Sequence, residues 1–278
     1  MSNKDLLENV KKLRELTGVG FKDCKLAIDE NDGDLEKSVE FLRKKGIAKA
    51  SKKMSRTASE GLALVCEKNN EVSIIEINSE TDFVAKNKDF ISFSKEISEI
   101  CFTQKGNMEK INSTSMKNNI SVKDNLIDLI AKIGEKITLR RSFFFDKEKG
   151  RNYFYVHGAI EKNVGKIISV VKISEEDSNI GNKLAMHIAA SSPLSINKDD
   201  LNQKLISKEL EIIKAELVNS GKKSDMIEKI ASGKINKYIS DNTLLNQVWI
   251  MDPKKKVSDI LQNIKIINFV RYKVGEGV

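Results

Sequence analysis

The sequence predicts an α+β protein: an N-terminal bundle of three helices, followed by a core of two repeated halves that each combine an antiparallel sheet with helices. Two observations carry this prediction. Apolar residues recur at helical spacing through the first fifty positions, and later they alternate with polar residues as in strands. The order of strands and helices then repeats. We divide the chain into a helical domain (1–50), a linker (51–59) and two core halves (60–147 and 148–278), the second with a helical hairpin inserted at about 198–240.

The composition fits a folded protein with an aliphatic core. The chain has 278 residues, enough for one large domain or two modest ones, and only 6% of them are aromatic. Its 48 Lys and Arg residues against 40 Asp and Glu residues give a net charge of +8, which would suit a nucleic-acid partner. However, Lys, Asn and Ile are frequent throughout, which indicates a general bias rather than a focused basic face.

The cysteines and the N-terminus indicate a compartment. Three widely spaced cysteines without a C-x-x-C pair predict buried free thiols rather than disulfides or a zinc site. The first residues show neither the apolar stretch of a signal peptide nor the Arg-rich character of a transit peptide. No run approaches the roughly 18 apolar residues that span a bilayer. We expect a soluble, cytoplasmic protein without membrane contact.

The helical domain is expected to contain three helices. The first has one apolar face, formed by Leu6, Leu7, Val10, Leu13 and Leu16. Glycines at positions 18 and 20 then permit a break. The second carries Cys24, Ala27 and Ile28 on its inner side, and Asp34 is placed as the N-cap of the third, which we expect Gly46 to end. A three-helix bundle with a G-V-G-F corner is similar to a ubiquitin-associated domain.

Residues 49–59 are polar and cationic and show no apolar period. Such a segment is typical of a linker between domains. The alternative is a tether for nucleic acid. That alternative rests on a single basic cluster without interleaved aromatic residues, so the linker is favoured.

The first core half begins with a hairpin. Residues 61–67 and 71–78 alternate as strands around an Asn69-Asn70 turn. A polar turn follows, then a helix with one apolar side formed by Phe90, Phe93, Ile97, Ile100 and Cys101. We expect the Ser- and Asn-rich stretch 104–119 to be loose. A further helix around 126–133 leads into a strand at 136–145.

The second half shows the same order. Residues 153–161 and 164–173 form a second predicted hairpin, residues 184–191 its helix, and residues 265–273 the closing strand. The inserted helices have a narrow apolar seam and a turn at Ser220-Gly221, while their other faces are strongly charged. This pattern predicts an antiparallel, solvated arm.

The motifs of common enzyme classes are missing from the sequence. It contains no P-loop, no G-x-S-x-G elbow and no H-E-x-x-H helix, and Gly18-Val19-Gly20 follows a helix rather than the strand that a dinucleotide site requires. Of the two histidines, His187 lies among apolar residues and is expected to be structural. We expect a non-catalytic protein that needs no metal or cofactor.

Two strings carry a resemblance to a known family. Residues 78–86 read N-S-E-T-D-F-V-A-K and follow a strand directly, where loops commonly display residues for partners. Residues 13–25 read L-R-E-L-T-G-V-G-F-K-D-C-K. Both resemble elongation factor Ts, as do residues 186–191, Trp249 and residues 271–277. Two departures are that Ala27-Ile28 stands where the family usually has a second basic residue, and that many members continue with a C-terminal helix, whereas this chain ends at Val278.

The resemblance implies a role and a set of contacts. It implies a nucleotide-exchange factor that binds elongation factor Tu, disturbs its magnesium and phosphate site and promotes release of GDP, without binding nucleic acid. The implied contacts in the bundle are Arg14, Val19, Gly20, Phe21, Lys22 and Lys25. Those in the loop after the strand are Thr81, Asp82, Phe83 and Val84, with Phe83 as a wedge. His157 would face the partner's more distant domain.

The residues taken alone leave alternatives open. Phe83 could instead pack under its own sheet, and Asp82 could cap the helix that follows. Gly20 and Phe21 could form a plain corner between helices. The rival functions are a ubiquitin-associated-like module that recognises another protein or a nucleic acid, and, less supported, an enzyme.

Overall fold

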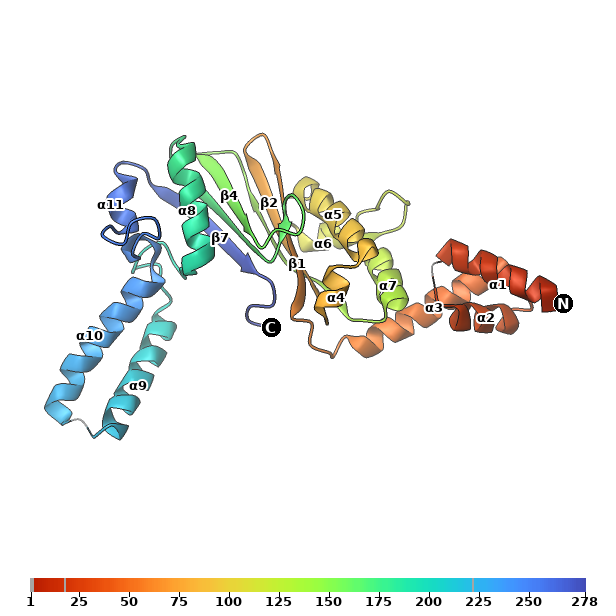
Figure 1. The fold of residues 1–278 in the computed structure, drawn as a ribbon, viewed down its shortest axis with the longest axis horizontal. Helices are drawn as coiled ribbons and strands as arrows, with labels where there is room; N and C mark the ends of the chain where they lie inside the picture. Colours follow the sequence, from red (N-terminus) through yellow and green to blue (C-terminus); the bar gives the residue numbers. More distant parts are fainter. Residues whose placement is uncertain (1–2, 18, 222) are drawn as a thin grey trace.

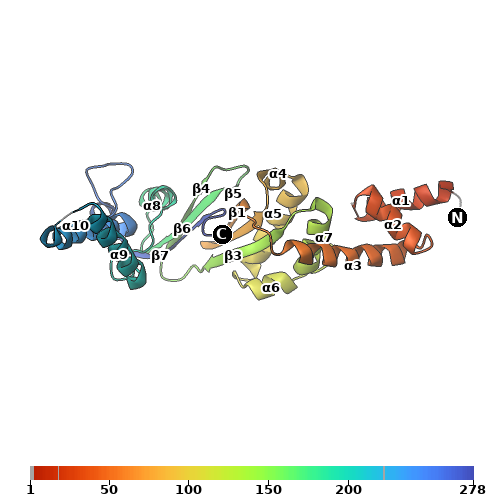
Figure 2. The same ribbon diagram turned by 90° about the horizontal axis from the view of Figure 1, so that it is seen from below.

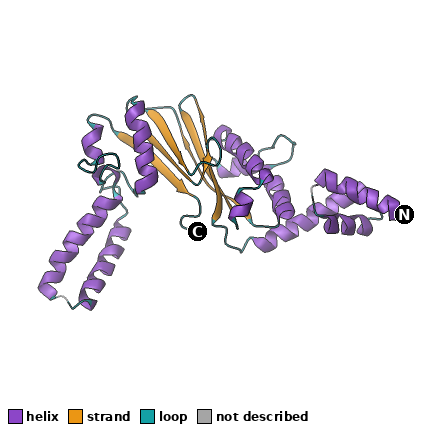
Figure 3. Cartoon of the chain, viewed as in Figure 1, coloured by secondary structure: helices purple, strands orange, loops and turns teal. Residues whose placement is uncertain are grey.

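The computed structural model describes residues 3–17, 19–221 and 223–278 and shows an elongated molecule. The three N-terminal helices lie at one end, two sheets lie in the middle, and an antiparallel pair of helices projects at the other end (Figures 1 and 2). Strands therefore gather at the centre and helices at both ends (Figure 3). The coarse prediction of a mixed α+β protein with helices at the N-terminus is confirmed.

The N-terminal unit consists of α1 (Asn3–Thr17), α2 (Phe21–Glu30) and α3 (Leu35–Lys53). Its small core is formed by Val10, Leu13, Cys24, Ala27, Ile28 and Leu42. The Asp34 side chain accepts the Lys37 amide at 3.0 Å, which confirms it as the N-cap of α3. Gly18, one of the two expected helix breakers, lies outside the described residues.

The prediction that Gly46 ends the third helix is wrong. Helix α3 continues to Lys53, so the first part of the predicted linker is helical. The reason is packing, because α3 lies against α7 (Val122–Ile133): a Cβ at Gly46 would stand 3.2 Å from the Ala131 Cβ. The pair Arg43–Asp124, at 3.0 Å, joins the same helices. Gly46 therefore allows two helices to approach closely instead of ending one.

The first sheet has the strand order β3-β2-β1-β5, with antiparallel neighbours. Its strands are β1 (Glu60–Lys68), β2 (Glu71–Ser79), β3 (Ile137–Phe145) and β5 (Val164–Gly165). Its helices are α4 (Asp82–Ala85), α5 (Lys88–Thr103), α6 (Met108–Ser113) and α7. Buried Leu64 and Ile75 of the sheet share one core with Phe90 and Ile97 of α5. The predicted hairpin of 61–78 is confirmed.

The Ser- and Asn-rich stretch 104–119 is more ordered than expected. It contains α6, whose N-cap Asn107 accepts the Lys110 amide at 3.0 Å, and Ile111 is fully buried in the first core. Ser115 and Ser121 are joined by an isolated β-bridge. The composition was misleading because Asn and Ser act here as caps and turn residues around one apolar anchor.

The second sheet has the order β4-β6-β7 and is antiparallel. It consists of β4 (Arg151–His157), β6 (Ile167–Ile173) and β7 (Ile266–Lys273), covered by α8 (Ser178–Ser191). A third cluster, with Val65 and Ile74 from the first sheet and Ile168 and Tyr272 from the second, joins the two sheets.

The predicted strand 164–173 is divided between the sheets. Gly165 pairs with Ala63 in the first sheet, and Ile167 pairs with His157 in the second. A Cβ at Gly165 would lie 2.9 Å from the carbonyl oxygen of His157, so the crossing requires glycine.

The region expected to form a helical arm contains α9 (Gln203–Asn219) and α10 (Ser224–Asn242). They pack on each other through Ile213, Leu217 and Ala231. The chain then passes through a short 3-10 turn and α11 (Val257–Leu261) to β7. In Figure 1 the arm points away from both sheets, at the end opposite the N-terminus.

Candidate partner-binding site

Phe83 stands on the surface of a short helix whose other side is buried. The helix, α4, follows β2 directly, and Phe83 is 79% exposed. Its neighbours Val84 and Ala85 are 5% and 1% exposed and belong to the core of the first sheet. The alternative in which Phe83 packs under its own sheet is therefore wrong. Val84, also in the predicted contact set, has its side chain in that core rather than on the surface, and its contact with a partner stays a prediction.

The start of α4 is bound to a neighbouring loop. The Thr81 backbone N–H donates to Glu135 Oε2 at 3.0 Å, and the Thr81 hydroxyl donates to Glu135 Oε1 at 2.8 Å. The Thr81 side chain thus makes a contact within the protein. Thr81 is partly exposed, and its contact with a partner stays a prediction.

Asp82 is partly exposed beside Phe83. Its carboxylate pairs with Lys86 at 2.7 Å, and this hydrogen bond holds the pKa of Asp82 below its ordinary value. The helix that follows is capped by Asn87, which accepts the amides of Asp89 at 2.8 Å and Phe90 at 3.3 Å. The alternative that Asp82 caps that helix is therefore wrong. Asp82 presents a negative charge one residue before an exposed aromatic ring.

The predicted contacts of the N-terminal unit lie at the end of α1 and the start of α2. Arg14, Lys22 and Lys25 are exposed, Phe21 is 43% exposed, and Val19 is half-buried. Gly20 is the N-cap of α2, with φ −61, and a Cβ there would meet no described atom within 4 Å. A corner between helices explains the position but does not explain the glycine.

His157 ends β4 and is exposed. Its ring lies 6.2 Å from that of Tyr155. Helix α2, α4 and β4 are spread along the molecule (Figure 1), so the three groups of predicted contacts do not form one pocket. Such an arrangement suits a large partner rather than a small molecule.

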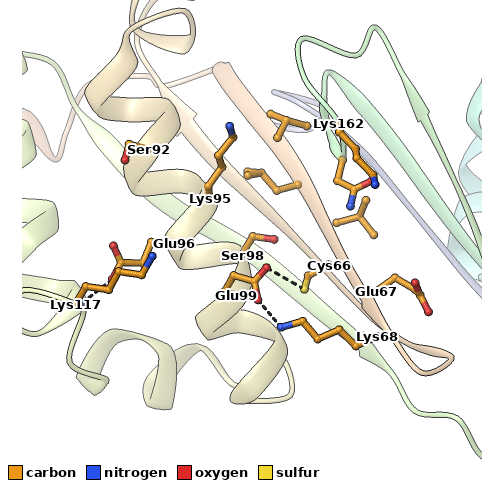
Figure 4. Close-up of a pocket in the computed structure, with 14 residues that line it drawn as sticks. Cys66, Glu67, Lys68, Ser92, Lys95, Glu96, Ser98, Glu99, Lys117 and Lys162 are labelled. Carbon is orange, nitrogen blue, oxygen red and sulfur yellow. Dashed lines mark hydrogen bonds and ion pairs between the residues drawn. The ribbon is translucent and has the colours of Figure 1, made fainter.

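The open groove in Figure 4 lies between β1 and α5 and has a volume of about 460 Å³. Opposite charges pair along it: Lys68 contacts Glu99 at 2.5 Å, and the Cys66 thiol donates to Glu99 at 3.6 Å. Burial raises the pKa of Cys66 to about 11, so its thiol stays protonated at neutral pH. None of the described residues that line the groove belongs to the predicted contact set.

The other titratable candidates are structural. His187 is fully buried, stacks on Trp249 with ring centroids 5.1 Å apart, and contacts Gln247 at 3.0 Å. The prediction of a structural histidine is confirmed. All three cysteines are buried and free. Within the described ranges, no group of three His, Cys, Asp or Glu side chains could hold a metal ion.

Sequence reasoning missed the residues that hold α4. Glu80 accepts the Lys136 amide at 2.6 Å and contacts Arg56 at 3.3 Å, while Glu135 holds Thr81. Glu80 lies inside the N-S-E-T-D-F-V-A-K string, but the sequence contains no signal that it would meet a loop more than fifty positions away.

Comparison with known proteins places the chain in a family. The family model described as Elongation factor TS matches residues 80–276. Elongation factor Ts of Methylobacterium nodulans is 38% identical, over 97% of this chain and 92% of the relative. Elongation factor Ts of Methylococcus capsulatus is 39% identical with the same coverage. The chain belongs to the elongation factor Ts family.

The match to the elongation factor Ts family includes the helix that carries the exposed Phe83 ring. The matched range includes α4, the loop with Glu135 and the whole second sheet, whereas β1 and β2 of the first sheet precede it. The similarity to the relatives extends over 97% of the chain. The protein is thus a factor of translation elongation. In the part of the chain that the structure describes, no helix combines the length and apolarity needed to cross a bilayer.

Proposed function

We propose that this protein binds elongation factor Tu and promotes the release of GDP from it, without a cofactor or a covalent step. The observation that carries the proposal is Phe83, a largely exposed ring on a helix held from behind by buried Val84 and Ala85 and from its start by Glu135. In a member of the elongation factor Ts family, such a ring is suited to enter a partner as a wedge.

The physical requirement is differential binding. A GTPase holds its nucleotide through magnesium and through backbone amides around the phosphates. An exchange factor must bind the nucleotide-free shape better, and this linkage is reciprocal. Each tenfold loss of nucleotide affinity requires about 1.4 kcal/mol, so several decades of acceleration require roughly 4–7 kcal/mol. A desolvated aromatic anchor is among the few single side chains that supply a large part of this.

The contacts divide by position. Phe83 and Asp82 act near the magnesium and phosphate site of the partner. The exposed corner with Arg14, Gly20, Phe21, Lys22 and Lys25 docks on its nucleotide-binding domain, with Val19 beneath that corner. His157 meets a more distant domain. A partner of this size accounts for contacts spread along the molecule.

The architecture is part of the proposal. The N-terminal unit is a ubiquitin-associated-like domain, and the two sheets with their helices are repeated halves, because β1-β2-α5-β3 has the same order as β4-β6-α8-β7. The helical arm is an insertion in the second half. Since α3 extends to Lys53, we place the linker at residues 54–59.

The test is stopped-flow release of a fluorescent GDP analogue from elongation factor Tu. The wild-type protein should accelerate release in a concentration-dependent way, and Phe83→Ala should slow that release at least about tenfold. Leu194→Ala is the matched control, because it truncates another exposed apolar side chain outside the contact set. A normal rate of GDP release with a folded Phe83→Ala protein would contradict the role of Phe83 as a wedge.

Salt dependence separates this function from nucleic-acid binding. An interface anchored by an aromatic ring should weaken less between 50 and about 200 mM salt than contacts with phosphates, which lose orders of magnitude in affinity. Lys22→Glu together with Lys25→Glu should weaken binding to the GTPase without changing stability, since both side chains are exposed. If this double variant retained its affinity for the GTPase, the main contact would lie in the part of the protein that contains the two sheets.

A further inference from the structure

Two loops beside Phe83 hold each other through glutamate carboxylates. The ladder between β2 and β3 ends at the pair Ser79–Ile137. Immediately beyond it, Glu80 accepts the Lys136 amide at 2.6 Å, and Glu135 accepts the Thr81 amide at 3.0 Å. Each loop thus supplies the acceptor for a backbone N–H of the other. Bonds to ionised acceptors are stronger than those between neutral groups, so the crossing fixes both loops.

Glu135 also determines how α4 begins. Thr81 occupies the N-cap position of α4, but its side chain forms no cap bond to the helix in the described chain. Its hydroxyl donates to Glu135 at 2.8 Å instead. A single helical turn is marginal without outside support. Two supports are present: Val84 and Ala85 anchor the helix in the core, and Glu135 holds the residue two positions before Phe83.

The same two loops are also attached to the end of α3. The Lys136 ammonium donates to the carbonyl oxygens of Met54 at 2.8 Å and Arg56 at 2.7 Å, and the Lys53 ammonium donates to that of Gly134. Arg56 returns to Glu80 at 3.3 Å. The segment that leaves the N-terminal unit and the helix that carries Phe83 are therefore held by one set of contacts.

We propose that Glu135 is a positioning residue for nucleotide exchange: by holding Thr81 through two hydrogen bonds, it fixes the direction in which Phe83 meets the GTPase. This inference rests on the proposed function. An anchor that is ordered before binding loses less entropy on association. A site whose supporting contacts are loose binds its target in many unproductive orientations. Phe83 makes the contact, and Glu135 acts through it.

The test compares Glu135→Ala, Glu135→Gln and the double variant Glu135→Ala/Phe83→Ala in the release of a fluorescent GDP analogue. Glu135→Ala should lower the maximum rate about fivefold while the half-saturating concentration changes less than about twofold, since the docking corner on α2 is untouched. Glu135→Gln keeps one acceptor and should recover part of the rate. The double variant should be no slower than Phe83→Ala, because residues acting as a unit are not additive.

Glu176→Ala is the matched control. It removes a carboxylate of an exposed ion pair, with Arg151 at 2.7 Å, in the second half of the core, and it should leave the exchange rate unchanged. A purely structural role for Glu135 would slow the Phe83→Ala background further and would not be rescued by glutamine. Either of these results would overturn the proposal.

Hydrogen–deuterium exchange of the free protein tests, without the partner, whether Glu135 holds the start of α4. In Glu135→Ala, amides 81–86 should exchange at least about tenfold faster, with the rest of the first sheet unchanged. Unchanged protection together with an unchanged maximum rate would overturn the inference. If the wild-type protein fails to accelerate GDP release, the proposed function fails, and with it the role of Glu135 in nucleotide exchange. Faster amide exchange in Glu135→Ala would still show that Glu135 holds α4 in the free protein.

Discussion

The backbone N–H of Gly275 donates to the carboxylate of Glu76 at 2.9 Å, although the two residues stand 199 positions apart in the chain. Glu76 lies on β2 in the first sheet, and Gly275 follows β7 in the second. The fully buried carboxylate also accepts from Arg141 at 2.6 Å and Arg140 at 2.9 Å. This network links the segment after β7 to β2 and so joins the two sheets.

Removal of the Glu76 carboxylate should destabilise the protein strongly. Glu76→Ala removes the buried carboxylate that pairs with two partly exposed arginines, and we expect a loss of about 3 kcal/mol in the free energy of unfolding. Urea unfolding followed by circular dichroism measures it. The control Glu228→Ala removes an exposed pair with Lys214 and should change stability by less than about 1 kcal/mol. Equal losses in both variants would show that the network contributes no more than a surface pair.

The same network should make stability sensitive to acid. Burial raises the pKa of Glu76, but the Gly275 amide, Asn78 and the two arginines outweigh it, so the pKa lies below its ordinary value. A depressed pKa means that the stabilisation is present above the unfolded value of about 4.3 and is lost as pH falls through the folded value. Urea midpoints between pH 7 and 3 should therefore fall less steeply in Glu76→Ala than in the wild type.

His187 should produce a second pH dependence, nearer to neutrality. The Ile250 amide donates to His187 Nδ1 at 3.4 Å, so Nε2 carries the proton toward Gln247. Burial lowers the pKa of His187, so the neutral form is favoured in the folded state. The stabilisation is present above the unfolded value of about 6.5 and is lost as pH falls through the folded pKa.

Because the sequence has two histidines, the comparison is simple. Urea midpoints of the wild type should fall between pH 7 and 5.5, His187→Leu should flatten that dependence, and the exposed His157→Leu should keep it. A dependence that survives in His187→Leu would assign it to other groups.

The sequence predicted those elements whose pattern is local. Helical spacing placed α1 and α5, alternation placed the hairpin of β1 and β2, and Asp34 marked the start of α3. These features depend on residues a few positions apart. The exposure of Phe83 could not be derived this way. A single helical turn is too short for a periodic pattern that would distinguish its buried side from its exposed side. The prediction that Phe83 is exposed required the resemblance of the surrounding string, and the structure then decided between the two orientations.

The errors share a physical cause, which is contact between distant segments. Gly46 resembled a helix end because its packing against Ala131 of α7 has no local trace. The strand predicted at 164–173 is divided because Gly165 joins one sheet and Ile167 the other. The contacts of Glu80 with the Lys136 amide and of Glu135 with the Thr81 amide were not recognised, because hydrogen bonds between loops follow no sequence period.

Two glycines should respond in opposite ways to a methyl group. Gly275 has φ +78, and its Cβ would stand 2.0 Å from the Ser59 carbonyl oxygen, so Gly275→Ala forces a backbone shift and disturbs the Glu76 contact. We expect a loss of more than about 2 kcal/mol in unfolding free energy. Gly20→Ala has no such conflict and should keep stability within about 0.5 kcal/mol.

Binding gives the second readout for this pair. If the corner at Gly20 docks on the GTPase, the added methyl in Gly20→Ala should weaken binding in a titration while urea unfolding stays unchanged. Unaltered affinity would return this position to a plain corner between helices.

Phe83 and Val84 should separate function from stability within one helical turn. Val84→Ala removes buried methyl groups from the core and should lower the free energy of unfolding by about 2 kcal/mol. Phe83→Ala truncates a ring that is already in solvent and should change it by less than about 0.5 kcal/mol, although it slows GDP release. Urea unfolding of the two variants side by side provides the measurement. A large loss in Phe83→Ala would mean that the ring packs on the protein in solution, and an exposed wedge would then be untenable.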